Sequence, residues 1–207
     1  MTRLHELAEL GQSIWYDNIR RALLDHGDLQ ALVEAGVTGV TSNPSIFEKA
    51  IAGSADYDEA LGEMVPEGGS ETELYEALAI EDIQRAADIL RPVYDRTEGV
   101  DGYVSLEVSP TLAHDTEGTI ADARRLFAAV DRSNVMIKVP ATPAGIPAIE
   151  ALIGEGINVN VTLMFSLAHY NAVTSAYIAG LEKLASTGGD LSKVASVASF
   201  FAVSYTH

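Results

Sequence analysis

Short apolar runs rich in β-branched residues alternate with amphipathic segments along the whole chain. The apolar runs predict strands at Ser13–Asp17, Val37–Asn43, Gly102–Val108, Val135–Val139, Ile157–Met164 and Val194–Ser199. Apolar residues spaced near 3.6 predict helices at Asp28–Ala35, Glu71–Tyr94, Thr116–Val130, Gly145–Ile153 and Leu167–Ala185. A repeated succession of strand and helix indicates parallel βαβ units, and we expect them in one α/β domain over residues 1–207.

Local signals support several of these boundaries. Gly36 follows the first predicted helix, where a glycine commonly stops one. Ser70 and Glu73 fit the capping box Ser-x-x-Glu at the start of the second. Pro66–Glu73 and Ser186–Asp190 have the composition of loops between elements, and Asn43-Pro44 has that of a turn.

Two architectures satisfy repeated βαβ units, a doubly wound open sheet and a (β/α) barrel. An open sheet often carries a glycine-rich phosphate loop after its first strand. Neither G-x-G-x-x-G nor G-x-x-x-x-G-K-[ST] occurs in this sequence. The absence of both motifs favours the barrel.

Each predicted strand places a polar residue near its carboxyl end, on the face that would point into a barrel. In "NVMIKVPAT", Val135, Ile137 and Val139 form one row, which leaves Lys138 on the other. The same alternation puts Ile157, Val159, Val161 and Leu163 toward the helices. The inward polar residues are then Asp17, Thr41, Asn43, Glu107, Lys138, Asn160, Thr162 and Ser199. The carboxyl ends of barrel strands are where active sites are assembled.

The residue types in this ring suit aldol chemistry on a sugar. A lysine amine can attack a carbonyl and form a Schiff base. The carbinolamine that forms first must lose water, and this dehydration needs groups that move protons. Glu107 and Asp17 are suitable acids and bases. Asn43, Asn160, Thr162 and Ser199 can form hydrogen bonds with a polyhydroxylated substrate. The alternative for Lys138, Glu107 and Asp17 is a structural ion-pair network, and for the Asn and Thr residues it is a role as caps or turns after strands.

Composition limits the class of protein, its partners and its cellular compartment. The chain has 207 residues, 47% hydrophobic and 21% charged, which is typical of a globular protein. Lys and Arg number 13 against 30 Asp and Glu, so the net charge is −17. This charge argues against partners such as nucleic acid or a membrane surface, and an anionic substrate would need a locally positive pocket. Without cysteines, thiolate chemistry is excluded. No signal peptide or membrane span is recognisable, so we expect a cytoplasmic protein.

Several segments together resemble the transaldolase family of class I aldolases of the pentose phosphate pathway. They are "IWYDNI" (14–19), "GVTSNPSIFEKAI" (39–51), "VDGYVSLEVSP" (100–110), "NVMIKVPAT" (134–142), "GINVNVTLMFS" (156–166) and "SVASFF" (196–201). The resemblance implies a (β/α)8 barrel of the TIM type. It also implies transfer of a dihydroxyacetone unit between sugar phosphates through a lysine Schiff base, with no metal or organic cofactor.

The resemblance also implies roles for individual residues. Lys138 would form the Schiff base, and Glu107 would act as acid and base through a water held with Thr162. Asp17 would be the second acid/base group, at the substrate hydroxyls. The remaining residues would bind substrate: Asn43 and Asn160 at the dihydroxyacetone hydroxyls, Ser199 and Phe201 along the pocket, and Thr41 in the same inward row. From residue type alone, Phe200 and Phe201 are more simply core residues.

The sequence departs from the family pattern after "SFF". Family members continue with a "VSR"-like run, whose arginine grips the substrate phosphate, and with two further strand–helix units. Here Val203-Ser204 is followed by Tyr205, and a complete barrel typically has about 250 residues. We therefore expect only the first six β/α units, a barrel incomplete at its C-terminus, and a transaldolase that is C-terminally truncated. A homo-oligomer in which a second copy covers the open barrel edge is one solution.

Three hypotheses follow from the sequence. The first is a transaldolase that uses Lys138. The second is a catalytically impaired fragment that keeps the site residues but lacks phosphate recognition. The third is a Schiff-base aldolase for small unphosphorylated sugars, because that reaction also uses a lysine and can dispense with a phosphate clamp.

Overall fold

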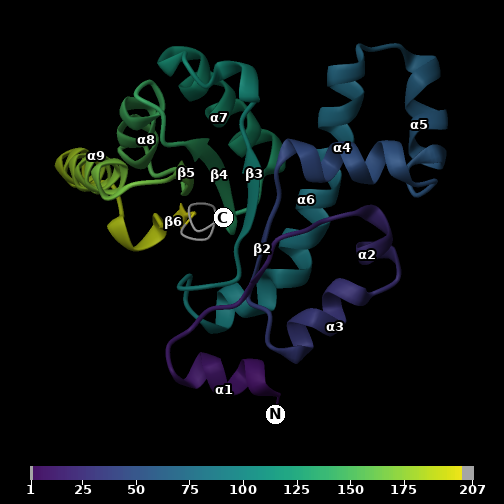
Figure 1. The fold of residues 1–207 in the computed structure, drawn as a ribbon, viewed down its shortest axis with the longest axis horizontal. Coiled ribbons are helices and arrows are strands. Elements are labelled where there is room, and N and C mark those ends of the chain that lie inside the picture. Colours follow the sequence, from purple (N-terminus) through teal and green to yellow (C-terminus); the bar gives the residue numbers. More distant parts are fainter. Residues whose placement is uncertain (1, 202–207) are drawn as a thin grey trace. The chain divides into compact units, whose positions relative to one another are not determined.

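The computed structural model describes residues 2–201, apart from the side chain at position 67 (Figure 1). These residues form two compact units. The first unit contains residues 2–106 and 130–134, and the second contains residues 107–129 and 135–201. The predicted single domain over residues 1–207 stays a prediction.

The first unit contains the first two strands and most of the third, all parallel. They are β1 (Trp15–Tyr16), β2 (Gly39–Thr41) and β3 (Val104–Glu107), of which only Glu107 belongs to the second unit. Its helices are α1 (Arg3–Glu9), α2 (Arg21–Asp25), α3 (Asp28–Ala35), α4 (Pro44–Gly53), α5 (Asp58–Met64) and α6 (Glu71–Arg96), with a 3₁₀ turn η1 (Val65–Glu67). Trp15 lies opposite Gly39 and Val40 opposite Val104 in the parallel register.

The second unit contains three further parallel strands, β4 (Val135–Pro140), β5 (Val159–Met164) and β6 (Ser196–Phe200). Its helices are α7 (Thr116–Val130), α8 (Gly145–Ile153) and α9 (Leu167–Ser186), with 3₁₀ turns η2 (Pro110–Leu112) and η3 (Leu191–Lys193). Helices α8 and α9 lie side by side (Figure 1), and Gly180 permits this close approach. A Cβ on Gly180 would lie 2.8 Å from the carbonyl oxygen of Glu150.

In both units the strands are parallel and neighbours in chain order, and helices separate them along the chain. This confirms the predicted fold class, an α/β fold of the (β/α) TIM-barrel type represented by six β/α units. Strand β4 is buried on both faces, as a parallel sheet covered by helices requires, because every one of its residues is buried. Ile149, Leu152 and Ile153 of α8 are fully buried in the same unit.

The structure confirms the five predicted helices, two of which run slightly further than predicted. Helix α6 continues to Arg96 and α9 to Ser186. The capping box is present: the Glu73 amide donates to the Ser70 hydroxyl (3.3 Å), and the Ser70 amide donates to the Glu73 carboxylate (2.7 Å). Gly36 ends α3 with φ 113°, which a residue with a side chain rarely adopts.

The prediction missed four helices, α1, α2, α4 and α5, and one miss bears on the site. Asn43 was placed at the end of the second strand and Asn43-Pro44 in a turn. The strand ends at Thr41, and Asn43 is instead the N-cap of α4, with Pro44 in the first turn. A Pro at this position loses no intrahelical hydrogen bond and starts the helix well.

The predicted alternation in the fifth strand is wrong at Leu163. Val161 lies opposite Ala198 but Met164 lies opposite Phe200, so β5 carries one residue more than β6 over this interval. Leu163 takes the extra position with φ 59°. Its side chain is 42% exposed instead of covered by helices, and Met164 is fully buried in its place. A β-bulge of this kind changes which residues face which side.

A buried polar cluster joins α2, α5 and α6 in the first unit. The Tyr57 hydroxyl accepts from the Arg21 amide (3.0 Å) and donates to the Asp82 carboxylate (2.8 Å). The Arg21 guanidinium donates to both Asp82 (3.0 Å) and Glu81 (2.8 Å). Tyr57 and Asp82 are fully buried, so their polar groups depend on these partners.

Candidate functional site

Lys138 is buried on β4 and forms an ion pair with Glu107. The Lys138 Nζ lies 3.6 Å from the Glu107 Oε2, and the two side chains are 7% and 14% exposed. Glu107 is the last residue of β3, and the Val108 amide donates to the Lys138 carbonyl oxygen (3.2 Å). The backbone therefore holds the two residues beside each other at the carboxyl ends of their strands.

The environment of Glu107 favours its protonated form. Burial raises the pKa of its carboxyl, and the Lys138 ammonium opposes this shift without cancelling it. A carboxyl group with a raised pKa can give up and accept a proton near neutral pH more readily than an exposed glutamate.

Two of the predicted hydrogen-bonding residues lie on the strand next to Lys138. In the parallel register Lys138 is opposite Asn160, and Pro140 is opposite Thr162. Asn160 and Thr162 are both 1% exposed. On β6, the Ser199 hydroxyl donates to the Asn160 side-chain oxygen (2.9 Å). The second unit thus gathers Lys138, Glu107, Asn160, Thr162 and Ser199 near the carboxyl ends of its strands.

Residue type alone suggested that the two phenylalanines after Ser199 are core residues, and this prediction is wrong. Phe200 and Phe201 are 40% and 36% exposed. The Phe201 amide donates to the Met164 carbonyl oxygen (2.9 Å), and its ring centroid lies 5.4 Å from that of Phe165. The substrate contact implied for Phe201 by resemblance stays a prediction.

The other three predicted residues belong to the first unit. The Asn43 side-chain oxygen accepts from the Ile46 amide (2.9 Å), so the alternative reading as a helix cap is correct for that oxygen. The amide nitrogen of Asn43 remains a donor. The Thr41 hydroxyl is buried and has no hydrogen-bond partner among residues 2–201. Such a group calls for an explanation, and a substrate hydroxyl would provide one.

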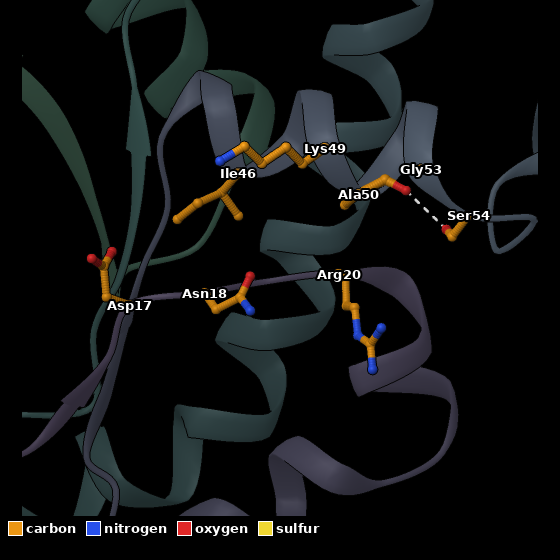
Figure 2. Close-up of a pocket in the computed structure, with 8 residues that line it drawn as sticks. All are labelled: Asp17, Asn18, Arg20, Ile46, Lys49, Ala50, Gly53 and Ser54. Carbon is orange, nitrogen blue, oxygen red and sulfur yellow. Dashed lines mark hydrogen bonds between the residues drawn. The ribbon is translucent and has the colours of Figure 1, made fainter.

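Asp17 follows β1 directly and is exposed at the edge of a cavity of about 370 Å³. Asn18 and Arg20 continue this wall, and Ile46 and Lys49 of α4 form the facing one (Figure 2). Asn18, Arg20 and Lys49 were not among the predicted residues, and Lys49 lies on α4, a helix that the sequence analysis missed. Among residues 2–201, no three His, Asp or Glu side chains gather as a potential metal site.

Comparison with known proteins identifies the family. The model of the family described as "Transaldolase/Fructose-6-phosphate aldolase" matches residues 14–204.

None of the helices between residues 2 and 201 is both long and apolar enough to cross a membrane.

Three curated relatives are similar over nearly the whole chain. A protein named "Transaldolase" from Trichodesmium erythraeum (strain IMS101) is 52% identical over 199 residues, which cover 96% of this chain and 52% of the relative. "Transaldolase 2" from Nostoc sp. (strain PCC 7120 / SAG 25.82 / UTEX 2576) is 53% identical over 97% of this chain and 53% of its own length. "Transaldolase" from Thermobifida fusca (strain YX) is 52% identical over 96% of this chain and 54% of its own.

The chain therefore spans about half the length of the curated relatives it matches. The family match, by contrast, extends over most of the chain and includes every residue of the predicted site, from Asp17 to Phe201. On these grounds the chain belongs to the transaldolase/fructose-6-phosphate aldolase family.

Proposed function

We propose that this chain carries the Schiff-base centre of a transaldolase, which transfers a dihydroxyacetone unit from a ketose phosphate to an aldose phosphate. Sedoheptulose 7-phosphate or fructose 6-phosphate would be the donor. The observation that carries the proposal is the buried Lys138 on β4, with its Nζ 3.6 Å from Glu107. The relatives named as transaldolases support the choice of reaction.

In the first step the neutral Lys138 amine attacks the ketone carbon of the donor. A carbinolamine forms, and loss of its hydroxyl as water leaves an iminium ion on Lys138. Glu107 is the proposed acid, because its carboxyl has a raised pKa and lies beside the amine. The proposal includes a water that Thr162 holds and that passes the proton between Glu107 and the carbinolamine.

In the second step the carbon–carbon bond breaks. Asp17 takes the proton from the hydroxyl on the carbon next to that bond, the aldehyde product leaves, and the bonding electrons pass to the iminium as an enamine. The enamine then attacks the acceptor aldehyde, Asp17 returns the proton, and water releases the ketose product from Lys138. Asp17 enters this scheme from the family resemblance.

The proposed substrate contacts are polar groups at strand ends. Asn160 and Asn43 would bind the hydroxyls of the dihydroxyacetone unit, and Ser199 orients Asn160 by donating to its side-chain oxygen. The unpartnered Thr41 hydroxyl would bind a further substrate hydroxyl. Phe201 would line the same pocket.

Borohydride trapping tests the proposal directly. The chain is incubated with fructose 6-phosphate and then reduced, which converts an imine on lysine into a stable secondary amine. We expect a mass increase on the peptide that contains Lys138. The variant Lys138→Met should give no adduct, whereas Lys183→Met, which removes an exposed lysine of α9, should leave the adduct unchanged.

An adduct on another lysine, or none on Lys138, would refute the assignment. The family description also includes fructose-6-phosphate aldolase. An assay with erythrose 4-phosphate separates the two reactions: transfer to the acceptor supports the transaldolase, and release of free dihydroxyacetone alone supports the aldolase.

We further propose a cytoplasmic enzyme that is a homo-oligomer. Sugar phosphates are metabolites of the cytoplasm, which supports the location. Sedimentation velocity measures the association: a species of twice the chain mass of 22.0 kDa or more supports it, and a monomer at all concentrations refutes it.

A further inference from the structure

We propose that a second cavity of the first unit, lined by residues of α1, α3 and α6, binds a small zwitterion with an apolar body, such as an aliphatic α-amino acid. Asp101 would bind the ammonium group of this ligand, and Arg96 would bind its carboxylate. All residues that line the cavity belong to the first unit, and none of them is a predicted site residue. The proposal therefore goes beyond the proposed function.

The cavity lies at the amino ends of the first three strands. Its wall includes Ser13 before β1, Thr38 before β2 and Asp101 before β3. Asp17 and Thr41, by contrast, stand at the carboxyl ends of β1 and β2. A ligand in this cavity would therefore bind at the opposite end of the strands from the predicted site residues of this unit.

Helix α1 closes one side of the cavity. The Thr2 hydroxyl donates to the Ala35 carbonyl oxygen at the end of α3, so the two helices lie together (Figure 1). A Cβ on Gly36 would lie 2.8 Å from the Leu4 Cβ, and the glycine therefore permits this close contact. The cavity has a volume of about 440 Å³, which is within the range of small-molecule sites.

Asp101 brings to the cavity a buried carboxylate with one unused oxygen. Its Oδ1 accepts from the Trp15 indole nitrogen (3.1 Å) and from the Gly102 amide (3.1 Å). Its own amide donates to the Thr97 hydroxyl (3.1 Å), which fixes its position. Asp101 is only 6% exposed, and its Oδ2 accepts no hydrogen bond from residues 2–201. A buried carboxylate oxygen calls for a donor, and a ligand in the cavity can supply it.

Arg96 lines the same cavity from the last turn of α6. The arginines of the first unit that form ion pairs include Arg21, Arg85, Arg91 and Arg132. Arg96 and Asp101 take part in no ion pair within residues 2–201, either with each other or with other residues. A ligand with a single charge would match one of these two residues and be repelled by the other, whereas a zwitterion matches both.

The rest of the wall favours an aliphatic body for the ligand. Val33, Val37, Val93 and Ala8 line the cavity with apolar surface. Burial of an aliphatic side chain against them is favourable, because it removes apolar surface from water on both sides. A polyhydroxylated sugar phosphate fits poorly, because these side chains offer its hydroxyls no hydrogen bonds and Asp101 would repel its phosphate.

Trp15 is a direct reporter of binding, because it is the only tryptophan of the chain and donates to Asp101. Its fluorescence is followed during a titration with L-leucine at constant ionic strength. Equilibrium dialysis with labelled leucine measures binding without relying on the fluorescence. We expect saturable binding in both experiments. A lack of saturable binding in the dialysis overturns the proposal.

Three analogues test the parts of the ligand one by one. Isoamylamine lacks the carboxylate of leucine, 4-methylpentanoate lacks the ammonium group, and glycine lacks the apolar side chain. We expect each analogue to bind about tenfold or more weakly than leucine. An affinity equal to that of leucine for isoamylamine or for 4-methylpentanoate would show that one charge is not recognised, and it overturns the zwitterion site.

Two substitutions test the residues. Asp101→Asn keeps an oxygen for Trp15 and Gly102 and replaces the unused oxygen with an amide nitrogen, and Arg96→Gln removes the cation from an exposed side chain. We expect each to weaken leucine binding by about tenfold or more. The control Arg3→Gln removes an exposed arginine of α1 that does not line the cavity, and it should leave the affinity unchanged. Wild-type affinity in either cavity variant overturns the proposal.

Discussion

The ammonium nitrogen of Lys138 lies 3.6 Å from Oε2 of Glu107, and both side chains are largely buried. This separation is longer than the 2.7–2.9 Å typical of a charge-assisted N–H···O bond, so the pair is close without being tightly locked. An ion pair of this kind has two interpretations, a structural pair within the sheet and a reactive amine beside its acid. The two differ in what they predict for the loss of the carboxylate.

Replacement of Glu107 by Gln should slow Schiff-base formation. We expect the rate of borohydride trapping at Lys138 to fall by about 10²- to 10⁴-fold, which is the usual contribution of a general acid or base. The control Glu155→Gln removes a carboxylate paired with Arg124 in the same unit and should leave the rate unchanged. A purely structural pair would instead lower stability and leave the trapping rate per folded molecule at its wild-type value.

The raised pKa of Glu107 should also appear in the pH dependence of stability. Its pKa is raised by burial in the folded chain, whereas the pKa of an unfolded glutamate is about 4.3. Between the unfolded and the folded pKa of Glu107, the folded chain therefore binds more protons than the unfolded chain. The contribution of Glu107 to stability is present below the unfolded pKa and is lost as pH rises through the folded pKa.

The difference between wild type and Glu107→Gln isolates this contribution from the many other carboxylates. We expect urea unfolding from pH 4 to 8 to show that wild type loses stability relative to the variant as pH rises. A difference that is constant with pH would show that Glu107 titrates alike in the folded and unfolded chains.

The Tyr57 hydroxyl should contribute more to the free energy of unfolding than an exposed tyrosine hydroxyl. In Tyr57→Phe the buried Asp82 carboxylate loses one donor and the Arg21 amide loses its acceptor. We expect a loss of about 1–3 kcal/mol in the free energy of unfolding, measured with urea. Tyr170→Phe, at a side chain that is 44% exposed, is the matched control and should change stability by less than about 0.5 kcal/mol. Equal effects of the two substitutions would contradict the importance of the buried cluster.

The parallel strands and the longer helices could be predicted because their patterns are local and repeated. Lys138 illustrates this, because alternation along Val135–Val139 placed it opposite the apolar row before its pairing with Glu107 was visible. The predicted alternation failed at Leu163, where a left-handed residue adds one position to β5. No composition signal marks a bulge at a leucine, since glycine is the residue that usually takes this conformation.

The unpredicted part of the candidate site depends on α4. The helix begins at Pro44, and an Asn-Pro pair, which is typical of a turn, is also a good helix start. Lys49 therefore lay in a segment with no assigned structure, and its place beside the cavity could not be inferred. Which side chains line a cavity depends on tertiary packing, and a local sequence pattern does not show it.

Gly102 shows how such a backbone feature can be tested. It was predicted as the first residue of the third strand, but β3 begins at Val104 and Gly102 has φ 89°. A Cβ at Gly102 would lie 2.3 Å from the Tyr94 backbone nitrogen, so Gly102→Ala combines an unfavourable φ with a clash against a backbone that cannot move aside. Gly188→Ala is the control, because Gly188 has φ 78° with no atom within 4 Å.

The two alanine variants share the unfavourable φ and differ in the clash. We expect Gly188→Ala to cost about 1–2 kcal/mol in the free energy of unfolding, and Gly102→Ala to cost about 3 kcal/mol or more, because overpacking adds to the same backbone penalty. Urea unfolding of both variants measures the difference. If Gly102→Ala were no worse than Gly188→Ala, the chain before β3 would not pack as tightly against α6 as the structure shows, and the support of Glu107 at the end of that strand would need a different explanation.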